Sequence, residues 1–208
     1  MSDGQHPTIL PKPNGPLFVT NLKNLANRSG PIETKPTMAL CRCGKSSKKP
    51  FCDGTHKTIG FASAKSDNRV PDRRDEYVGA NVAIHDNRGI CAHAGHCTDE
   101  LPAVFRMRKK PWIDADAASP DEITAIVRKC PSGAISLAGL METDDAEPAI
   151  FVAPDGPYIV TGGPELLETE LGQAASKRHF TLCRCGQSRN KPFCDGSHWS
   201  AEFVDDDN

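Results

Sequence analysis

Two stretches of this 208-residue chain are near-copies of each other, and each carries three cysteines and one histidine. The first reads CRCGKSSKKPFCDGTH from Cys41 to His56, and the second reads CRCGQSRNKPFCDGSH from Cys183 to His198. Both have the spacing C-x-C-x8-C-x3-H. Thiolates and imidazole are metal ligands. The fold of this chain must therefore gather two equivalent ligand sets, each from a short stretch of sequence.

The three remaining cysteines form a third set in the middle of the chain, made of Cys91, Cys97 and Cys130. Three sets of three leave no cysteine over, which favours three metal centres. Disulfides with one free thiol are the alternative for a secreted protein. The first fifteen residues have no apolar core or basic start, so we expect no secretory signal. We therefore expect a reduced protein of the cytoplasm, where clustered cysteines more often bind metal.

Composition gives no support for a membrane protein or a nucleic-acid-binding protein. No run of about 18 apolar residues occurs, so we expect no membrane span. The net charge of −2 and the pI of about 6.4 give no electrostatic reason to expect nucleic acid as a partner. Basic residues do gather at Arg106, Arg108, Lys109 and Lys110. A solvated surface patch is the simpler interpretation of this group, and a docking site for an acidic redox partner is the alternative.

The duplication extends beyond the cysteines. GPLFVT from Gly15 matches GPYIVT from Gly156, and a phenylalanine stands five residues after each motif histidine. We interpret residues 16–64 and 157–204 as an internal repeat. β-Branched and aromatic runs predict short strands at the start of each unit and a second strand that enters each site, at 38–40 and 180–182.

The segment 75–140 between the repeats has a different character. We expect a strand over 77–84, a turn at 87–89 and a strand over 134–137. Ser119, Pro120 and Glu122 have the pattern of a helix start, and the helix leads into Cys130. Residues 1–15, 65–74 and 141–149 are polar or proline-rich, which predicts an arm and two linkers. The acidic residues from Asp205 to the C-terminus predict a frayed tail.

The spacing of the repeated motif suits two irons. A C-x-C pair at a strand exit can hold one iron, and the next cysteine with the histidine can hold a second. Asp53 and Asp195 would then cap a helix start whose backbone N–H groups face an anionic cluster. A structural zinc ion is the alternative for three cysteines and one histidine, although zinc sites usually use C-x2–4-C knuckles. A cluster with a purely structural role is a further alternative.

Both stretches match the CDGSH iron–sulfur pattern C-x-C-x2-[ST]-x3-P-x-C-D-G-[ST]-H at every defined position. The chain therefore resembles the CDGSH family, which includes mitoNEET, over about 50 residues per copy. The resemblance implies one [2Fe–2S] cluster per copy and a serine that hydrogen-bonds cluster sulfur, at Ser46 and Ser188. The implied ligands are Cys41, Cys43, Cys52 and His56 in the first copy, and Cys183, Cys185, Cys194 and His198 in the second. Members with one motif pair through a β-rich cap, so two motifs in one chain imply an intrachain pseudo-dimer.

The middle segment resembles the divergent monocluster ferredoxins. Aligned to C-x2-C-x2-C with a remote Cys-Pro, Cys91 and Cys97 are the outer cysteines and Ala94 stands at the middle position. Three thiolates suit a [3Fe–4S] cluster. The alternatives are a [4Fe–4S] cluster with His93 or His96 as fourth ligand, and core thiols without metal.

These observations predict a small multidomain α+β protein, in which two CDGSH units form the pseudo-dimer and the ferredoxin-like domain lies between them. We expect a monomeric electron carrier that serves protein redox partners. Storage of [2Fe–2S] clusters and their transfer to apo-proteins is the alternative function, and redox or iron sensing is a third. The sequence shows no nucleophile–base pair and no glycine-rich phosphate loop, so we do not expect an enzyme.

The single histidine in each repeated site leads to a prediction about acid. Neutral imidazole is the weakest ligand of the four, and its protonation removes its bond to iron. The visible absorbance of both clusters should therefore fall as the pH drops below neutrality, and His56→Cys and His198→Cys variants should keep it to lower pH. Equal loss in the variants and the parent would contradict this.

Overall fold

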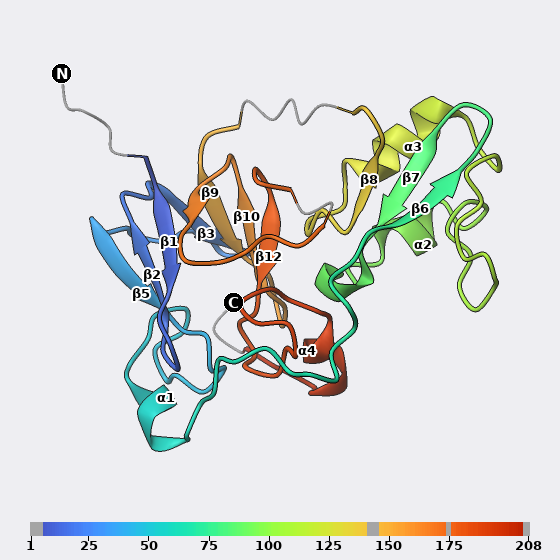
Figure 1. Ribbon diagram of the computed structural model, residues 1–208. Coiled ribbons are helices and arrows are strands. Elements are labelled where there is room, and N and C mark those ends of the chain that lie inside the picture. The colour runs from blue at the N-terminus through green and yellow to red at the C-terminus, as the bar shows by residue number, and fades with distance from the viewer. Residues whose placement is uncertain (1–5, 141–145, 174–175, 206–208) are drawn as a thin grey trace.

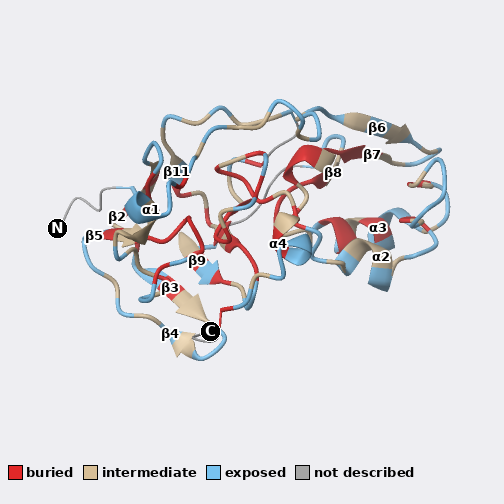
Figure 2. Cartoon of the chain, turned by 90° about the horizontal axis from the view of Figure 1, so that it is seen from below, coloured by how far each residue is buried: buried red, intermediate tan, exposed pale blue. Residues whose placement is uncertain are grey.

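The computed structural model describes residues 6–140, 146–173 and 176–205, and shows a mixed α+β protein with three small sheets. Two sheets are built from the repeats, and the third belongs to the segment between them (Figure 1). Figure 2 shows buried chain running from the repeat sheets towards β7 and β8, while the helices α2 and α3 also present exposed residues. The predicted α+β class with a separate middle unit is confirmed.

Each repeat, extended by one strand that precedes its predicted bounds of 16–64 or 157–204, contributes a matching series of strands. The first repeat supplies β1 (Thr8–Pro11), β2 (Leu17–Thr20), β3 (Asn24–Asn27), β4 (Gly30–Pro31) and β5 (Thr37–Leu40). The second repeat supplies β9 (Ala149–Val152), β10 (Tyr158–Thr161), β11 (Glu165–Leu166) and β12 (Phe180–Leu182). The strands predicted at the start of each unit and at each site are thus present.

The two repeats exchange a strand. One sheet has the order β11-β1-β2-β5, and the other has the order β12-β10-β9-β3-β4. Strand β11 of the second repeat pairs in parallel with β1, and β3 of the first repeat pairs in parallel with β9. Every other pairing in these two sheets is antiparallel. The exchange gives the pseudo-dimer expected from the duplication.

The exchanged sheets enclose one apolar core. Fully buried side chains from both repeats lie in it, among them Ile9, Leu17 and Leu25 from the first repeat and Val152 and Val160 from the second. Burying a branched aliphatic side chain contributes about 1.5–3 kcal/mol. Since these side chains pack on one another across the repeats, neither unit has a separate core.

The stretch expected to be an N-terminal arm contains a strand, and another strand begins at the last residue of the predicted linker 141–149. Thr8–Pro11 pairs with β2 along its whole length, and Ile9 is fully buried. Ala149–Val152 pairs with both β10 and β3. The first strand was not predicted because it contains Pro11, which lies beyond the two residues that pair with β11, so that its missing N–H faces an unpaired edge. Residues 65–74 contain no helix or strand up to β6, as a linker would, and residues 141–145 lie outside the described part.

The middle segment folds around its own small core. It contains β6 (Asp75–Val78), β7 (Ala83–Asp86), a 3₁₀ turn (Arg88–Ile90), α2 (His96–Glu100), α3 (Pro120–Val127) and β8 (Ile135–Leu137). The strand predicted over 77–84 is wrong, because the chain turns back there and the Gly79 amide donates to the Val82 carbonyl (2.8 Å). The predicted start of α3 is confirmed: Ser119 and Glu122 form a capping box. Within the described part of the chain, no helix is long and apolar enough to cross a membrane.

Two glycines bring the repeats together at the C-x-C turns. Gly44 has φ +76°, and a Cβ placed on it would lie 2.5 Å from the carbonyl oxygen of Cys185. Gly186 has φ +83°, and its Cβ would lie 2.6 Å from the carbonyl oxygen of Cys43. The contact is reciprocal, so each motif rests on the backbone of the other.

We expect Gly44→Ala to lower the free energy of unfolding by about 3 kcal/mol, from an unfavourable φ and a backbone overlap. Gly60→Ala is the matched control, because Gly60 has φ +65° and open space around it. The control should lose only about 1 kcal/mol. Chemical denaturation of both variants measures the difference, and equal losses would show that the close approach is not required.

Candidate metal centres

The C-x-C cysteines form a close pair in each repeat. Strands β5 and β12 end immediately before them, so both pairs sit at a strand exit. The Sγ atoms of Cys41 and Cys43 are 3.7 Å apart, and those of Cys183 and Cys185 are 3.8 Å apart. A tetrahedral metal bonded to sulfur at about 2.3 Å holds two thiolates about 3.8 Å apart. Each pair therefore has the spacing of two ligands on one metal.

The remaining cysteine and the histidine form a second pair. His56 lies on the short helix α1 (Thr55–Thr58) and His198 on α4 (Ser197–Ser200), one turn after Cys52 and Cys194. The distance from Sγ to Nδ1 is 3.3 Å in the first site and 3.4 Å in the second. Across the described residues, no three His, Cys, Asp or Glu side chains converge on one ion position. Two pairs of donors suit a two-metal centre better than a single zinc ion.

The aspartate of each motif braces the loop against the helix. Asp53 accepts hydrogen bonds from the Thr55 hydroxyl (2.7 Å) and from the amides of Thr55 (3.0 Å) and Ser47 (2.8 Å), which together lower the pKa of its carboxyl. Asp195 accepts the corresponding hydrogen bonds from the amides of Arg189 (2.8 Å) and Ser197 (3.0 Å). The predicted capping position is wrong: a left-handed glycine occupies the N-cap, and each aspartate, one residue earlier, accepts from the first amide of the helix.

The motif serines have a different partner from the one expected. The Ser46 hydroxyl donates to the Phe51 carbonyl (2.7 Å), and the Ser188 hydroxyl donates to the Phe193 carbonyl (2.6 Å). In this structure the hydroxyls close the loop and do not point their hydrogen at sulfur. The backbone amide of Ser46 instead hydrogen-bonds Cys41, one of several contacts that favour its thiolate.

Hydrogen bonding within the first C-x-C pair gives its two thiols different pKa values. The hydrogen bond from Cys43 lowers the pKa of Cys41 to about 6, and burial opposes this only in part. The same bond raises the pKa of Cys43. Metal binding at these sites must therefore displace protons from the thiols that remain protonated.

The arginine inside each C-x-C motif was not singled out from the sequence. Arg42 donates to the Gly15 carbonyl (3.0 Å), and Arg184 donates to the Gly156 carbonyl (2.9 Å). Both are almost fully buried. Arg184 also pairs with Asp205, which was expected to be exposed in a frayed tail and is instead 2 % exposed. The repetition of arginine in both copies was the signal available in the sequence; residues 206–208 lie outside the described part.

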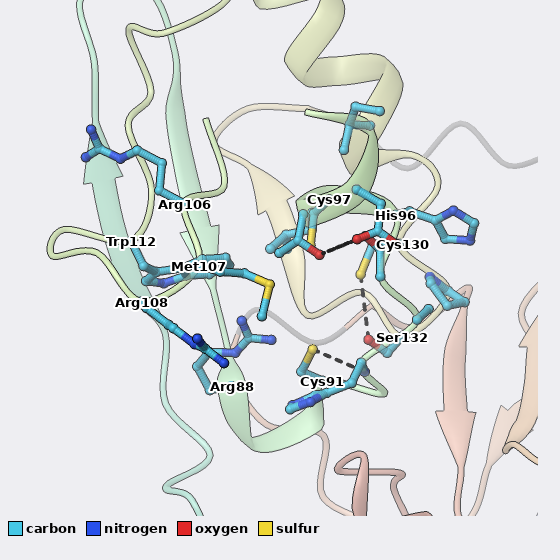
Figure 3. Close-up of a pocket in the computed structure, with 18 residues that line it drawn as sticks. Arg88, Cys91, His96, Cys97, Arg106, Met107, Arg108, Trp112, Cys130 and Ser132 are labelled. Atoms are coloured by element: carbon cyan, nitrogen blue, oxygen red, sulfur yellow. Dashed lines mark hydrogen bonds between the residues drawn. The ribbon is translucent and has the colours of Figure 1, made fainter. Parts of the chain in front are cut away.

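The three middle cysteines line one cavity of about 510 Å³. Cys91 follows the 3₁₀ turn, Cys97 lies on α2, and Cys130 follows α3. Figure 3 shows their side chains around a common space, although they come from separate elements. The cavity lies where the two apolar cores meet, because Cys130 packs against both.

Arg88 supplies positive charge to this cavity. Its guanidinium hydrogen-bonds Cys91, and it stacks 4.7 Å from the centre of the Trp112 ring. Burial tends to lower the pKa of Arg88, but the charges of Cys91 and Asp86 outweigh it and raise the pKa. Burial also raises the pKa of Cys91 to about 11, against the effect of Arg88. A cationic group beside the thiols stabilises an anionic cluster.

Neither candidate histidine is aligned as a fourth ligand. The Nδ1 atom of His96 lies 2.9 Å from Glu100, and Figure 3 shows its ring turned away from the cysteines. The His93 ring lies beside Gly196 in the second CDGSH motif, since a Cβ on that glycine would be 2.9 Å from it. Ala94 also lines the cavity and brings no donor.

The two CDGSH sites have different surroundings. The Asn190 side chain donates to the Gly89 carbonyl (2.8 Å) next to the middle site, whereas the first copy has the exposed Lys48 at that position. His93 covers Gly196, whereas the equivalent Gly54 has open space. Cys194 and His198 are buried at 3 % and 6 % exposure, while Cys52 and His56 are only half-buried.

Comparison with known proteins agrees with this organisation. A family model described as "Iron-binding zinc finger CDGSH type" matches residues 14–57 and 155–199. A model described as "Divergent 4Fe-4S mono-cluster" matches residues 77–139. The chain is also similar to the "Uncharacterized protein YjdI" of Escherichia coli K12, with 32% identity over 59 residues that span 28% of this chain and 78% of that protein. The protein of the same name from E. coli O157:H7 matches equally.

Proposed function

The chain belongs to the CDGSH family of iron–sulfur proteins and carries a divergent 4Fe-4S monocluster domain between its two CDGSH units; from this premise we propose that it carries single electrons between protein partners. A bound iron–sulfur cluster supplies one-electron chemistry at a potential set by its ligands and surroundings. The protein acts as a carrier without a reaction of its own. Its side chains hold the three centres, set their charge and keep them next to one another.

The repeated sites would each hold a [2Fe–2S] cluster. The support is the division of each ligand set into two pairs with one-metal spacing. Cys41 and Cys43 would bind one iron of the first cluster, and Cys52 and His56 would bind the other. Neutral imidazole in place of a thiolate removes a negative charge, which favours the reduced state.

The middle site would hold a [3Fe–4S] cluster on Cys91, Cys97 and Cys130. The matching family model describes a 4Fe-4S cluster, but that cluster type uses four cysteines and this cavity offers three. The support is the position of Ala94 in the cavity, together with the contact of His96 with Glu100. A [4Fe–4S] cluster completed by His93 or His96 is the alternative.

The observation that carries this proposal is that the second candidate site contacts both the first site and the middle site. The first and second sites meet through the glycine–carbonyl contacts at Gly44 and Gly186. The second and middle sites meet through His93 and Gly196, and through the hydrogen bond from Asn190 to the Gly89 carbonyl (2.8 Å). An electron that enters at the middle site thus has a short path to the second cluster and from it to the first.

Removing the middle cluster tests whether electrons enter the protein through it. We expect about seven irons per chain in the parent (two, two and three) and about four in Cys130→Ser. A reduced flavoprotein should reduce the CDGSH clusters of Cys130→Ser at least about tenfold more slowly, because electrons no longer enter through the middle centre. Dithionite should reduce both proteins alike. Stopped-flow absorbance and electron paramagnetic resonance measure each centre separately.

His96→Ala is the matched control, since it changes the same cavity without removing a sulfur. Its iron content and its rate should equal those of the parent. An unchanged rate in Cys130→Ser, with the CDGSH spectrum intact, would rule out entry through the middle centre. An iron content of about eight per chain (two, two and four), with no paramagnetic signal in the oxidised protein, would favour the [4Fe–4S] alternative.

Transfer of [2Fe–2S] clusters to apo-proteins is a second candidate function, confined to the first site. The observation in its favour is the half-buried pair of Cys52 and His56 beside the open space at Gly54. The corresponding ligands of the second site are buried under the middle domain. Exchange of a cluster requires access of an acceptor thiol to the iron, and the first site alone offers it.

Cluster transfer to an apo-ferredoxin should therefore be biphasic in the parent, with about half of the [2Fe–2S] absorbance transferred in the fast phase. His93→Gly should accelerate the slow phase, because it uncovers Gly196 while glycine suits the positive φ of that position (+55°). His96→Ala is again the control and should leave both phases unchanged. A single phase in the parent would contradict the difference between the sites.

A further inference from the structure

A basic loop lies at the mouth of the middle cavity. Phe105 and Ile113 pair in an isolated antiparallel β-bridge, and the residues between them form the loop. Four of its first five residues are basic: Arg106, Arg108, Lys109 and Lys110. Arg106, Met107 and Arg108 line the cavity that holds the three cysteines. Figure 3 shows Met107 and Arg108 together on one side of the cavity.

The loop is held at its base and exposed at its tip. Arg106 pairs with Asp114 (2.9 Å) and donates to the Pro111 carbonyl (3.0 Å), while its amide donates to the Trp112 carbonyl (2.6 Å). Met107 is 66 % exposed. Arg108, Lys109 and Lys110 are exposed, and none of them takes part in an ion pair with another described residue. Three cations are thus presented to solvent without an internal counter-charge.

Positive and negative charges lie on different sides of the cavity rim. Asp99 lines the cavity, and Glu100 lies nearby on the same helix, where Lys129 and His96 pair with it. The basic loop carries no carboxylate between Arg106 and Lys110. A negatively charged partner is therefore attracted to the loop side of the cavity, in a chain whose overall charge of −2 gives no general attraction for anions.

We propose that the surface made by Arg106, Met107, Arg108, Lys109 and Lys110 is the docking site of an acidic one-electron redox protein, such as a small flavoprotein. The proposal rests on the proposed electron-carrier function. In the docked complex one electron passes from the partner's reduced cofactor to the middle centre, so the partner is oxidised by one electron and one ferric ion becomes ferrous. No atom is transferred.

The chemistry of the loop suits a protein partner. Interfaces combine an apolar centre with a charged rim, and exposed Met107 among three cations has that composition. Methionine adapts its shape to different surfaces, which suits a brief encounter. Nucleic acid is disfavoured, because its affinity depends on many phosphate contacts and this loop offers few.

The test uses the iron-loaded full-length protein and flavodoxin, an acidic flavoprotein, as the probe. We expect the triple variant Arg108→Glu, Lys109→Glu, Lys110→Glu to lower the bimolecular rate of reduction of the middle centre by about tenfold or more at low salt. The parent rate should fall as salt is added, and the variant rate should not. Equilibrium binding of oxidised flavodoxin, which needs no electron transfer, should weaken in parallel.

The triple variant Lys23→Glu, Arg28→Glu, Lys35→Glu is the matched control. It changes the net charge by the same amount at exposed positions of the first repeat, beside β3 and β5, which share no sheet with the middle segment. The control should keep the parent rate and affinity. Equal loss in both variants would overturn the proposal, because it would show a general charge effect. Unchanged binding in the loop variant would also overturn it, as would tighter loop-dependent binding of a DNA oligonucleotide than of flavodoxin.

A neutral reductant separates this proposal from the function on which it rests. Photoreduced deazaflavin does not need the docking site, so it should reduce the middle centre equally in parent, loop variant and control. If it leaves the middle centre unreduced in all three, the electron-carrier function fails. If it reduces all three while flavodoxin treats the parent and the loop variant alike, only the docking site fails.

Discussion

The structure depends on the reciprocal packing of two C-x-C turns. Each turn must bring two thiols to one metal, and it does so with a left-handed glycine whose missing side chain leaves room for the carbonyl of the other turn. This contact requires the two repeats to lie face to face. The strand exchange of β3 and β11 then follows naturally, since chains that pack this closely can complete each other's sheets. One apolar core fills the space between them.

The middle domain makes the two CDGSH sites unequal. It contacts the second CDGSH site through Asn190 and His93, and it leaves the first site at the surface. Burial of a charged centre raises its electrostatic interaction with neighbours, because less water screens it. The second cluster is therefore expected to respond to the charge state of the middle centre more strongly than the first. The same contacts limit the access of solvent to Cys194.

Much of this organisation could be predicted from the residues, because the ligands stand close together in sequence. The pairs at Cys41 and Cys43, and the cap at Ser119, depend on local spacing, and local spacing is visible in a single chain. The strand at Thr8–Pro11 was missed because its partner is distant and its composition resembles a loop. Asp205 was misplaced for a similar reason: an acidic residue near a chain end is usually solvated, and only the folded chain brings Arg184 to it. The surroundings of His93 likewise depend on packing between domains.

Joining the two CDGSH units in one chain has a consequence for symmetry. In a homodimer, one substitution changes both copies of a site, so the two clusters must remain alike. Here the exchanged strands keep the geometry of a dimer while each half has its own sequence. Lys48 and Asn190 occupy equivalent positions, yet one faces water and the other holds a neighbouring domain. A covalent pair can thus assign an inward role to one cluster and an outward role to the other without altering the ligands of either.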